Sequence, residues 1–233
     1  MEFIVSQNCN TKLQIWNFPS GSLYHTINHN SVIWSFDVSD DSKVIVFNDY
    51  YGNIYLYSLL SKKIFKKIKT PVILIQVKIT SKIDRILSVF NKMNILNISL
   101  YPKFEYKKSQ KHNAIITEYD INEEKKIYVT SSLDNKIIIS NLKTNETIKE
   151  LNNFQPYVTR IIFNDTKFYT VSLDDEIKEW CLNKLKFIKY LYIDLNSILD
   201  LKFKNKNTII YSNNNQEIIQ KNLENNEPKI LNV

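Results

Sequence analysis

The sequence repeats itself with a period of about 41 residues, and this period allows few folds. Six short segments, each opening on an apolar residue after a polar turn, begin at residues 13, 54, 95, 137, 177 and 218. The steps between them are 41, 41, 42, 40 and 41 residues. A register this regular indicates consecutive copies of one supersecondary unit.

Each period contains four stretches that are typical of β-strands. In the fourth period these are residues 115–121, 126–131, 136–141 and 147–151, with a turn at Leu133-Asp134-Asn135. The stretches are rich in β-branched residues and no helical period separates them, so each unit is expected to form an antiparallel sheet. Four strands per 40 to 45 residues is typical of a propeller blade. We therefore predict an all-β fold, a β-propeller of about six blades.

The period also sets the predicted boundaries. We expect one domain, residues 1–233, made of units at about 1–28, 29–69, 70–111, 112–152, 153–193 and 194–233. The first unit is too short for an innermost strand, so the chain encodes five complete blades and three strands of another. A free strand edge exposes backbone donors and acceptors. We expect an open ring or one that a partner segment completes; the alternative is a start that has lost upstream residues.

Composition excludes several classes of protein. With 43% hydrophobic residues among 233, the chain can bury a core, and it has no run of about 18 apolar residues and no signal-peptide layout. We expect a soluble, non-secreted, cytoplasmic protein. Cys9 and Cys181 lie far apart without His or Cys at ligand spacing, which predicts two ordinary thiols. Two glycines in the whole chain exclude the glycine-rich loops that bind phosphates.

No catalytic, cofactor-binding or metal-binding residues are predicted, and we expect a protein that is not an enzyme and needs no cofactor. The acidic groups at residues 174–176 and 123–124 lie in expected turns, where charge is usually only solvated. Three histidines and two cysteines leave few candidates for acid–base or nucleophilic chemistry. Neither a membrane nor a small-molecule substrate is expected as a partner.

Lysines gather in the expected outer strands. The main cluster is Lys62, Lys63, Lys66, Lys67 and Lys69, and others lie at residues 103–111 and 184–189. Lysine on an edge strand guards against sheet aggregation. The alternative is contact with RNA phosphates or with a partner. Two observations argue against it: arginine is nearly absent, and the chain has a Lys- and Asn-rich bias typical of AT-rich coding. The net charge of +7 is therefore weak evidence for nucleic acid.

Several segments resemble WD repeats. Residues 5–17 resemble the second and third strands of such a repeat, Ser20-Gly21 resembles the turn that follows, and residues 130–137 are similar. The resemblance implies a His–Ser/Thr–Asp–Trp hydrogen-bond network within a blade. In this sequence no unit contains all four of these residues. The implied structural positions are His29, His112, Ser132, Asp134, Ser172, Asp174, Trp16 and Trp180. His25, in the first outer strand, is expected to be solvated.

A narrower resemblance points to one family of propellers. Residues 31–38 after His29, and 69–72 one blade later, resemble the second and third blades of subunit i of eukaryotic translation initiation factor 3; residues 127–134 and 156–159 are similar to a later blade pair. Trp34 stands in the inner strand, as in that family. The resemblance implies a non-catalytic scaffold that binds subunits b and g of the factor on the small ribosomal subunit, with rRNA contact by the lysines as an option. The family has seven blades, so this chain would be a compacted version.

Three alternatives stay open. Residues 97–104 resemble the end of the sixth blade of the ribosome-bound receptor for activated C kinase, although they fall in the third unit here. An open six-bladed propeller of a coat or nuclear-pore complex fits the missing strand. An RNA-binding propeller that uses the lysines would show steep salt dependence.

Overall fold

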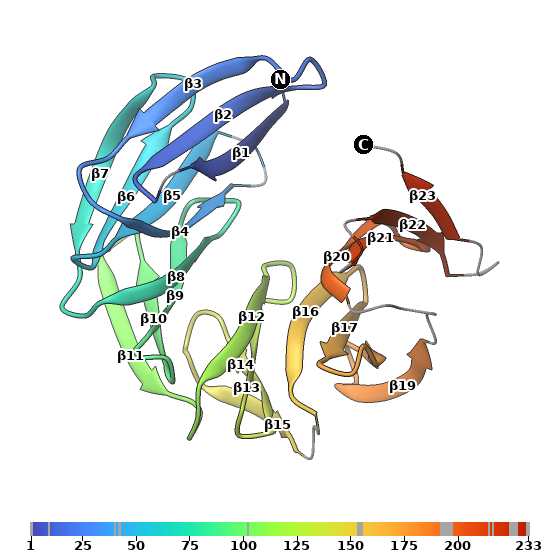
Figure 1. The fold of residues 1–233 in the computed structure, drawn as a ribbon. Coiled ribbons are helices and arrows are strands. Elements are labelled where there is room, and N and C mark those ends of the chain that lie inside the picture. Colours follow the sequence, from blue (N-terminus) through green and yellow to red (C-terminus); the bar gives the residue numbers. More distant parts are fainter. Residues whose placement is uncertain are drawn as a thin grey trace. The chain divides into compact units, whose positions relative to one another are not determined.

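The computed structural model describes the chain as two compact all-β units, residues 1–111 and 112–233. The described residues are 2–8, 10–39, 41, 43–101, 103–152, 156–191, 198–213, 215, 217–223 and 228–231. Every regular element among them is a strand, β1 to β23 (Figure 1). Over the same ranges there is no helix with the length and apolar character to cross a membrane.

The first unit holds three antiparallel sheets (Figure 1). The first sheet has three strands, β1 (Glu2–Asn8), β2 (Lys12–Phe18) and β3 (Leu23–Asn28). The second has four, β4 (Ile33–Val38), β5 (Val44–Asp49), β6 (Asn53–Ser58) and β7 (Lys63–Lys69). The third has β8 (Leu74–Ile79), β9 (Arg85–Phe90), β10 (Asn94–Ser99) and β11 (Glu105–Gln110).

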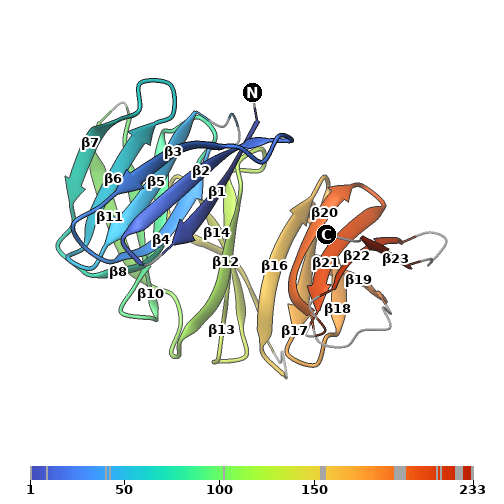
Figure 2. The same ribbon diagram turned by 45° about the horizontal axis from the view of Figure 1, so that its top comes forward.

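The second unit repeats the four-stranded sheet three times (Figure 2). Its first sheet is β12 (Ile116–Asn122), β13 (Ile127–Ser132), β14 (Ile137–Asn141) and β15 (Thr147–Leu151). Its second is β16 (Val158–Asn164), β17 (Lys167–Ser172), β18 (Ile177–Cys181) and β19 (Lys186–Leu191). Its third is β20 (Ile198–Asn205), β21 (Thr208–Asn213), β22 (Ile218–Asn222) and β23 (Pro228–Leu231).

These sheets confirm the predicted fold class. One sheet has three strands and five have four, in simple meander order, as the 41-residue period predicts. The prediction of a single domain and that of a ring completed by a partner stay predictions.

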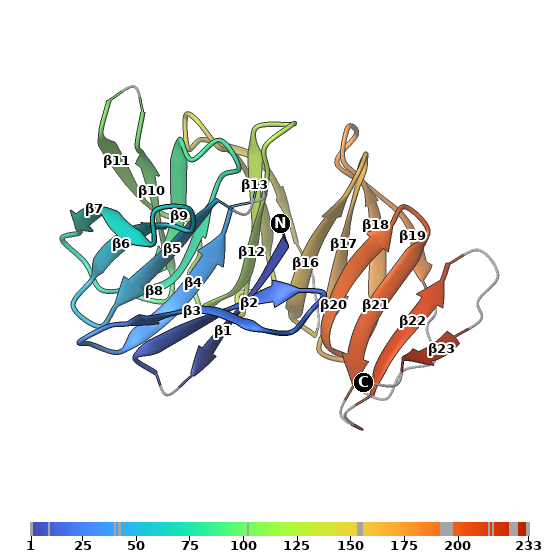
Figure 3. The ribbon, with the colours of Figure 1, turned by 90° about the horizontal axis from the view of Figure 1, so that it is seen from above.

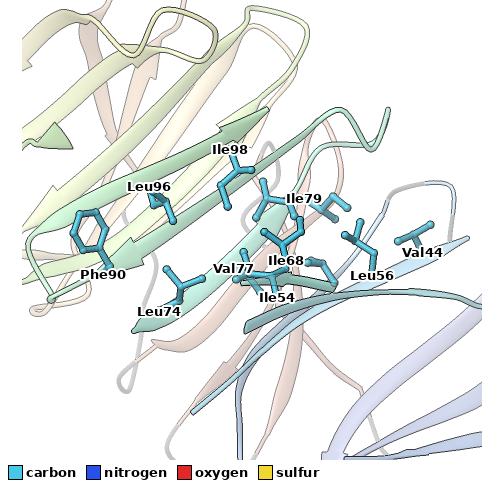
Figure 4. Close-up of a cluster of buried hydrophobic side chains, with 12 residues drawn as sticks. Val44, Ile54, Leu56, Ile68, Leu74, Val77, Ile79, Phe90, Leu96 and Ile98 are labelled. Carbon is cyan, nitrogen blue, oxygen red and sulfur yellow. The ribbon is translucent and has the colours of Figure 1, made fainter. Parts of the chain in front are cut away.

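Within each unit, neighbouring sheets pack through their faces. In the first unit β4 contacts β8, and in the second β12 contacts β16, which contacts β20 (Figure 3). The largest cluster joins the second and third sheets through side chains that include Ile54, Leu56, Leu74 and Leu96, all buried (Figure 4). These positions alternate along their strands because successive side chains of a strand point to opposite faces.

One-residue bulges recur at matching places in the sheets. On the outer strands the extra residue is Tyr24, Phe65, Ile148 or Ile188. On the inner strands it is Trp34, Ile75, Thr117, Thr159 or Leu199. A bulge leaves its extra residue without a cross-strand partner and re-aims the side chain. The same bulge thus recurs in the backbone of the sheets, and the residue at the bulge differs from sheet to sheet.

Candidate functional site

The fourth sheet contains a buried histidine network. His112, which precedes β12, lies with Nδ1 3.0 Å from Oδ2 of Asp134 and with Nε2 2.8 Å from Oγ1 of Thr130. Asp134 also accepts hydrogen bonds from the backbone N–H groups of Asn113 and Lys136. The network therefore ties the segment before β12 to the turn between β13 and β14.

Burial sets the protonation state of this network. It lowers the pKa of His112, and the charge of Asp134 opposes this shift only in part. A neutral His112 donates from Nδ1 to the carboxylate and accepts the Thr130 hydroxyl at Nε2. Although burial would raise the pKa of Asp134, hydrogen bonds from Asn113 and Lys136 and the contact with His112 hold this pKa below its ordinary value.

The His112 network predicts acid sensitivity near pH 6. In the unfolded chain His112 regains its ordinary pKa of 6.5 and binds a proton more tightly than in the fold. The free energy of unfolding should therefore fall as the pH drops below 6.5, by at most about 1.4 kcal/mol per pH unit for one group. Urea unfolding at pH 7.5, 6.5 and 5.5 measures this slope, and the His112→Asn variant should flatten it. An equal slope in both proteins would contradict a neutral, buried His112.

The fifth sheet keeps the other half of the implied network. Trp180 in β18 is buried, and its Nε1 donates to Oγ1 of Thr170, 3.0 Å away. The indole stacks on Phe168 with ring centroids 5.7 Å apart and planes 12° apart. In the first sheet, Nε1 of Trp16 donates to Oγ of Ser6 at 2.9 Å.

Both tryptophans occupy one repeated position, ten residues after the hydroxyl that they contact. That position is held in chain order by Trp16, Tyr57, Ile98, Ser140, Trp180 and Lys221. At Ser140 the hydroxyl is buried without a hydrogen-bond partner in the described structure. The fourth sheet has thus lost the tryptophan but kept His112, whereas the fifth has kept the tryptophan.

Two serines and an aspartate lie outside the network that the WD resemblance implies. His112 contacts Thr130 rather than Ser132, whose hydroxyl instead accepts the N–H of Asp134. Ser172 donates to the carbonyl of Glu176, while Thr170 serves Trp180. Asp174 is exposed and accepts only a long hydrogen bond, 3.3 Å, from the N–H of Glu176. In each strand the partner hydroxyl lies two residues before the predicted serine and on the same face of the sheet, because successive side chains alternate between the two faces.

The second sheet has a carboxylate site that the sequence analysis missed. Asp49, at the end of β5, is buried and accepts the N–H groups of Tyr51 and Asn53, the Asn53 amide and the Tyr55 hydroxyl at 2.8 to 3.1 Å. Nε2 of His29 lies 3.5 Å from Oδ2. Burial would raise the pKa of Asp49, but the hydrogen bonds from Asn53 and Tyr55 and the nearby His29 ring hold this pKa below its ordinary value.

The remaining predicted residues have plain structural surroundings. His25 is half-buried, with its ring 6.1 Å from that of Tyr57, and so is not simply solvated as expected. Cys181 is a free, half-buried thiol, and Cys9 lies outside the described residues. In the part of the chain that the structure describes, no three His, Cys, Asp or Glu side chains are grouped to hold a metal ion.

The lysine cluster follows the outer edge of the second sheet. Lys62 precedes β7, and Lys63, Lys66, Lys67 and Lys69 lie on it. Lys62 Nζ lies 4.1 Å from the Tyr24 ring centroid, and Lys67 Nζ lies 5.2 Å from that of Tyr55. These contacts hold the ammonium groups against aromatic faces.

The net positive charge of the chain comes from one unit. Residues 1–111 contain 15 Lys and Arg against seven Asp and Glu, a formal charge of +8, whereas residues 112–233 contain 16 against 17, a charge of −1. Lysines are spread over both units, as coding bias alone would produce. The asymmetry instead comes from the scarcity of carboxylates in the first unit.

Comparison with known proteins identifies the fold but no family. No family model and no curated protein sequence matches this chain. Among solved structures it resembles the Cps50 (Swd1) β-propeller domain of Myceliophteria thermophila, with a TM-score of 0.79 and 12% identity over 98% of this chain and 82% of that one. At this identity the likeness shows a six-bladed β-propeller fold alone.

Proposed function

We propose that this chain is a non-catalytic scaffold that binds protein partners in translation initiation on the small ribosomal subunit, in the cytoplasm. One observation supports the scaffold part: three groups that could do chemistry, His112, Asp134 and Asp49, are used inside the sheets. His112 and Asp134 hydrogen-bond with each other, and Asp49 is enclosed by its own turn and Tyr55. β-Propellers typically serve as such scaffolds, although a fold alone does not assign a function.

The narrower role rests on the resemblance to subunit i of eukaryotic translation initiation factor 3. Trp34, the inner-strand tryptophan of that resemblance, is 48% exposed. The partners would be subunits b and g of the factor. Their peptides would dock on loops and strand edges through a few aromatic anchors.

Affinity purification tests this role. The tagged chain is recovered from native lysate at low and at high salt, and mass spectrometry identifies the bound proteins. Initiation factor subunits should remain bound at both salt concentrations, and small-subunit ribosomal proteins should be lost at high salt because rRNA contacts are screened.

Each other outcome names a different scaffold. Recovery of coat or nuclear-pore components would overturn the initiation role and favour the open six-bladed alternative. Mature ribosomes without initiation factors would favour a scaffold like the receptor for activated C kinase.

A further inference from the structure

An exposed aromatic surface lies at one end of the second sheet, on residues Trp34, Tyr50 and Tyr51. Their side chains are 48%, 51% and 70% exposed. The rings of Trp34 and Tyr50 are nearly parallel, 15° apart with centroids separated by 6.3 Å, and Tyr51 meets Tyr50 edge to face at 5.6 Å. Three large rings, of which Tyr50 contacts both others, lie together at the surface, and such an exposed patch points to a binding site.

The backbone directs Trp34 outward. It is the extra residue of the β4 bulge, between the pairs Ile33–Asp49 and Ser35–Asn48. At the matching bulges of β12 and β16 the residue is a threonine whose hydroxyl bonds to a backbone carbonyl, of Val158 and Val171 respectively. The second sheet therefore uses a recurrent structural position to expose an indole.

The two tyrosines stand on a rigid turn. The carboxylate of Asp49 fixes the N–H groups of Tyr51 and Asn53, and the N–H of Tyr50 donates to the carbonyl of Val32. Gly52 has a φ of +79°, and a Cβ there would lie 2.4 Å from the Val72 carbonyl oxygen. The aromatic surface is thus held in place before any ligand arrives, which reduces the entropy lost on binding.

The charge around the aromatic surface suits an anion. Residues 29–34, 49–53 and 69–74, which form this end of the sheet, contain one carboxylate, and it is the buried Asp49. Lys69, opposite Asn53 on β7, is exposed beside the turn, and Lys67 follows on the same edge. Exposed lysines therefore lie on the outer strand beside the turn that carries the tyrosines, within a unit of formal charge +8.

We propose that this surface binds single-stranded RNA, with bases stacked on Trp34, Tyr50 and Tyr51 and phosphates at Lys67 and Lys69. Exposed aromatic faces beside lysines are the arrangement by which proteins hold unpaired nucleotides without reading sequence. The proposal goes beyond the scaffold role and does not depend on it, since RNA could bind here whether or not the partner is an initiation factor.

Fluorescence anisotropy tests the aromatic contacts with the whole chain and a labelled ten-nucleotide oligouridylate. Trp34→Ala and Tyr51→Ala should each weaken binding about tenfold, as expected for the loss of one base stack. Tyr51→Phe, which keeps the ring, should bind within about twofold of wild type. The matched control is Tyr101→Ala, which removes a tyrosine that is 73% exposed elsewhere in the same unit and should change nothing.

The lysines are tested by salt dependence. The Lys67→Gln/Lys69→Gln double variant should reduce the slope of log affinity against log salt by about 1.4, or 0.7 per lost phosphate contact. Lys62→Gln/Lys63→Gln removes the same charge at the far end of β7 and should leave the slope nearly unchanged. Melting curves show that every variant is folded.

Two results would overturn the proposal. Unchanged affinity in Trp34→Ala and Tyr51→Ala would mean that RNA does not use these rings. The second result is that oligoglutamate binds as tightly as oligouridylate and that both double lysine variants lose the same affinity. This would show only a general attraction of the basic unit for polyanions, and the rings would then be left to dock a protein instead.

Discussion

The Trp180→Ala variant is expected to lose about 4 kcal/mol of the free energy of unfolding of residues 112–233. The indole is buried against Phe168 and Phe187, and its N–H satisfies the Thr170 hydroxyl. The substitution therefore opens a cavity and leaves a buried hydroxyl without its partner. Urea unfolding followed by far-UV circular dichroism measures the loss. Trp180→Phe keeps much of the packing and should lower the free energy of unfolding by only about 1 to 2 kcal/mol relative to wild type.

Trp34→Ala is the matched control, because it removes the same side chain from an exposed bulge. Its free energy of unfolding should stay within about 0.5 kcal/mol of wild type. Similar losses in Trp34→Ala and Trp180→Ala would contradict the distinction drawn here between an interior tryptophan and a surface one.

The Asp49→Ala variant is expected to destabilise residues 1–111 by about 3 to 5 kcal/mol. The carboxylate accepts hydrogen bonds from Tyr51, Asn53 and Tyr55, and its removal leaves the buried donors of Asn53 and Tyr55 unpaired. Two of the three tryptophans, Trp16 and Trp34, lie in this unit, so tryptophan fluorescence during urea unfolding reports mainly on it.

Two comparisons sharpen the Asp49 result. Asp174→Ala removes an exposed turn aspartate and should cost no more than about 0.5 kcal/mol. Because the pKa of Asp49 lies below its ordinary value of 3.8, its stabilising charge is present above pH 3.8 and is lost as the pH falls through the lowered pKa. The gap between wild type and Asp49→Asn should therefore narrow in strong acid, and a gap independent of pH would contradict the role of the charge.

The period predicted the sheets well because it records spacing along the chain. Turn residues at intervals of 41 fixed where strands begin and end, and β12 to β15 start and stop within about a residue of the expected stretches. The three strands of the first sheet, against four in each of the others, followed from the same arithmetic. Strand alternation is local, so short-range sequence information is enough to find it.

Side-chain partners were predicted less well. The WD resemblance pointed to Trp180 at the end of a third strand, but the hydroxyl that it contacts is that of Thr170 rather than Ser172. Choosing between hydroxyls two residues apart needs the exact register, which bulges shift by one residue.

The Asp49 site was missed for a related reason. Asp49 is the last residue of β5, two positions before the place that Asp134 takes in its own sheet, so the repeat gave no signal there. The exposed Trp34 was noted only as an inner-strand residue. Its contact with Tyr50 depends on a bulge that the sequence does not reveal.

The most direct test of the scaffold role in initiation is sedimentation of the native chain with ribosomal particles. Lysate is fixed with formaldehyde and separated on a sucrose gradient, and the chain is followed by immunoblotting. The account predicts that the chain migrates with small ribosomal subunits and initiation factors and moves to lighter fractions after high-salt washing. A chain that stays in the lightest fractions, or that migrates with membranes, would contradict it.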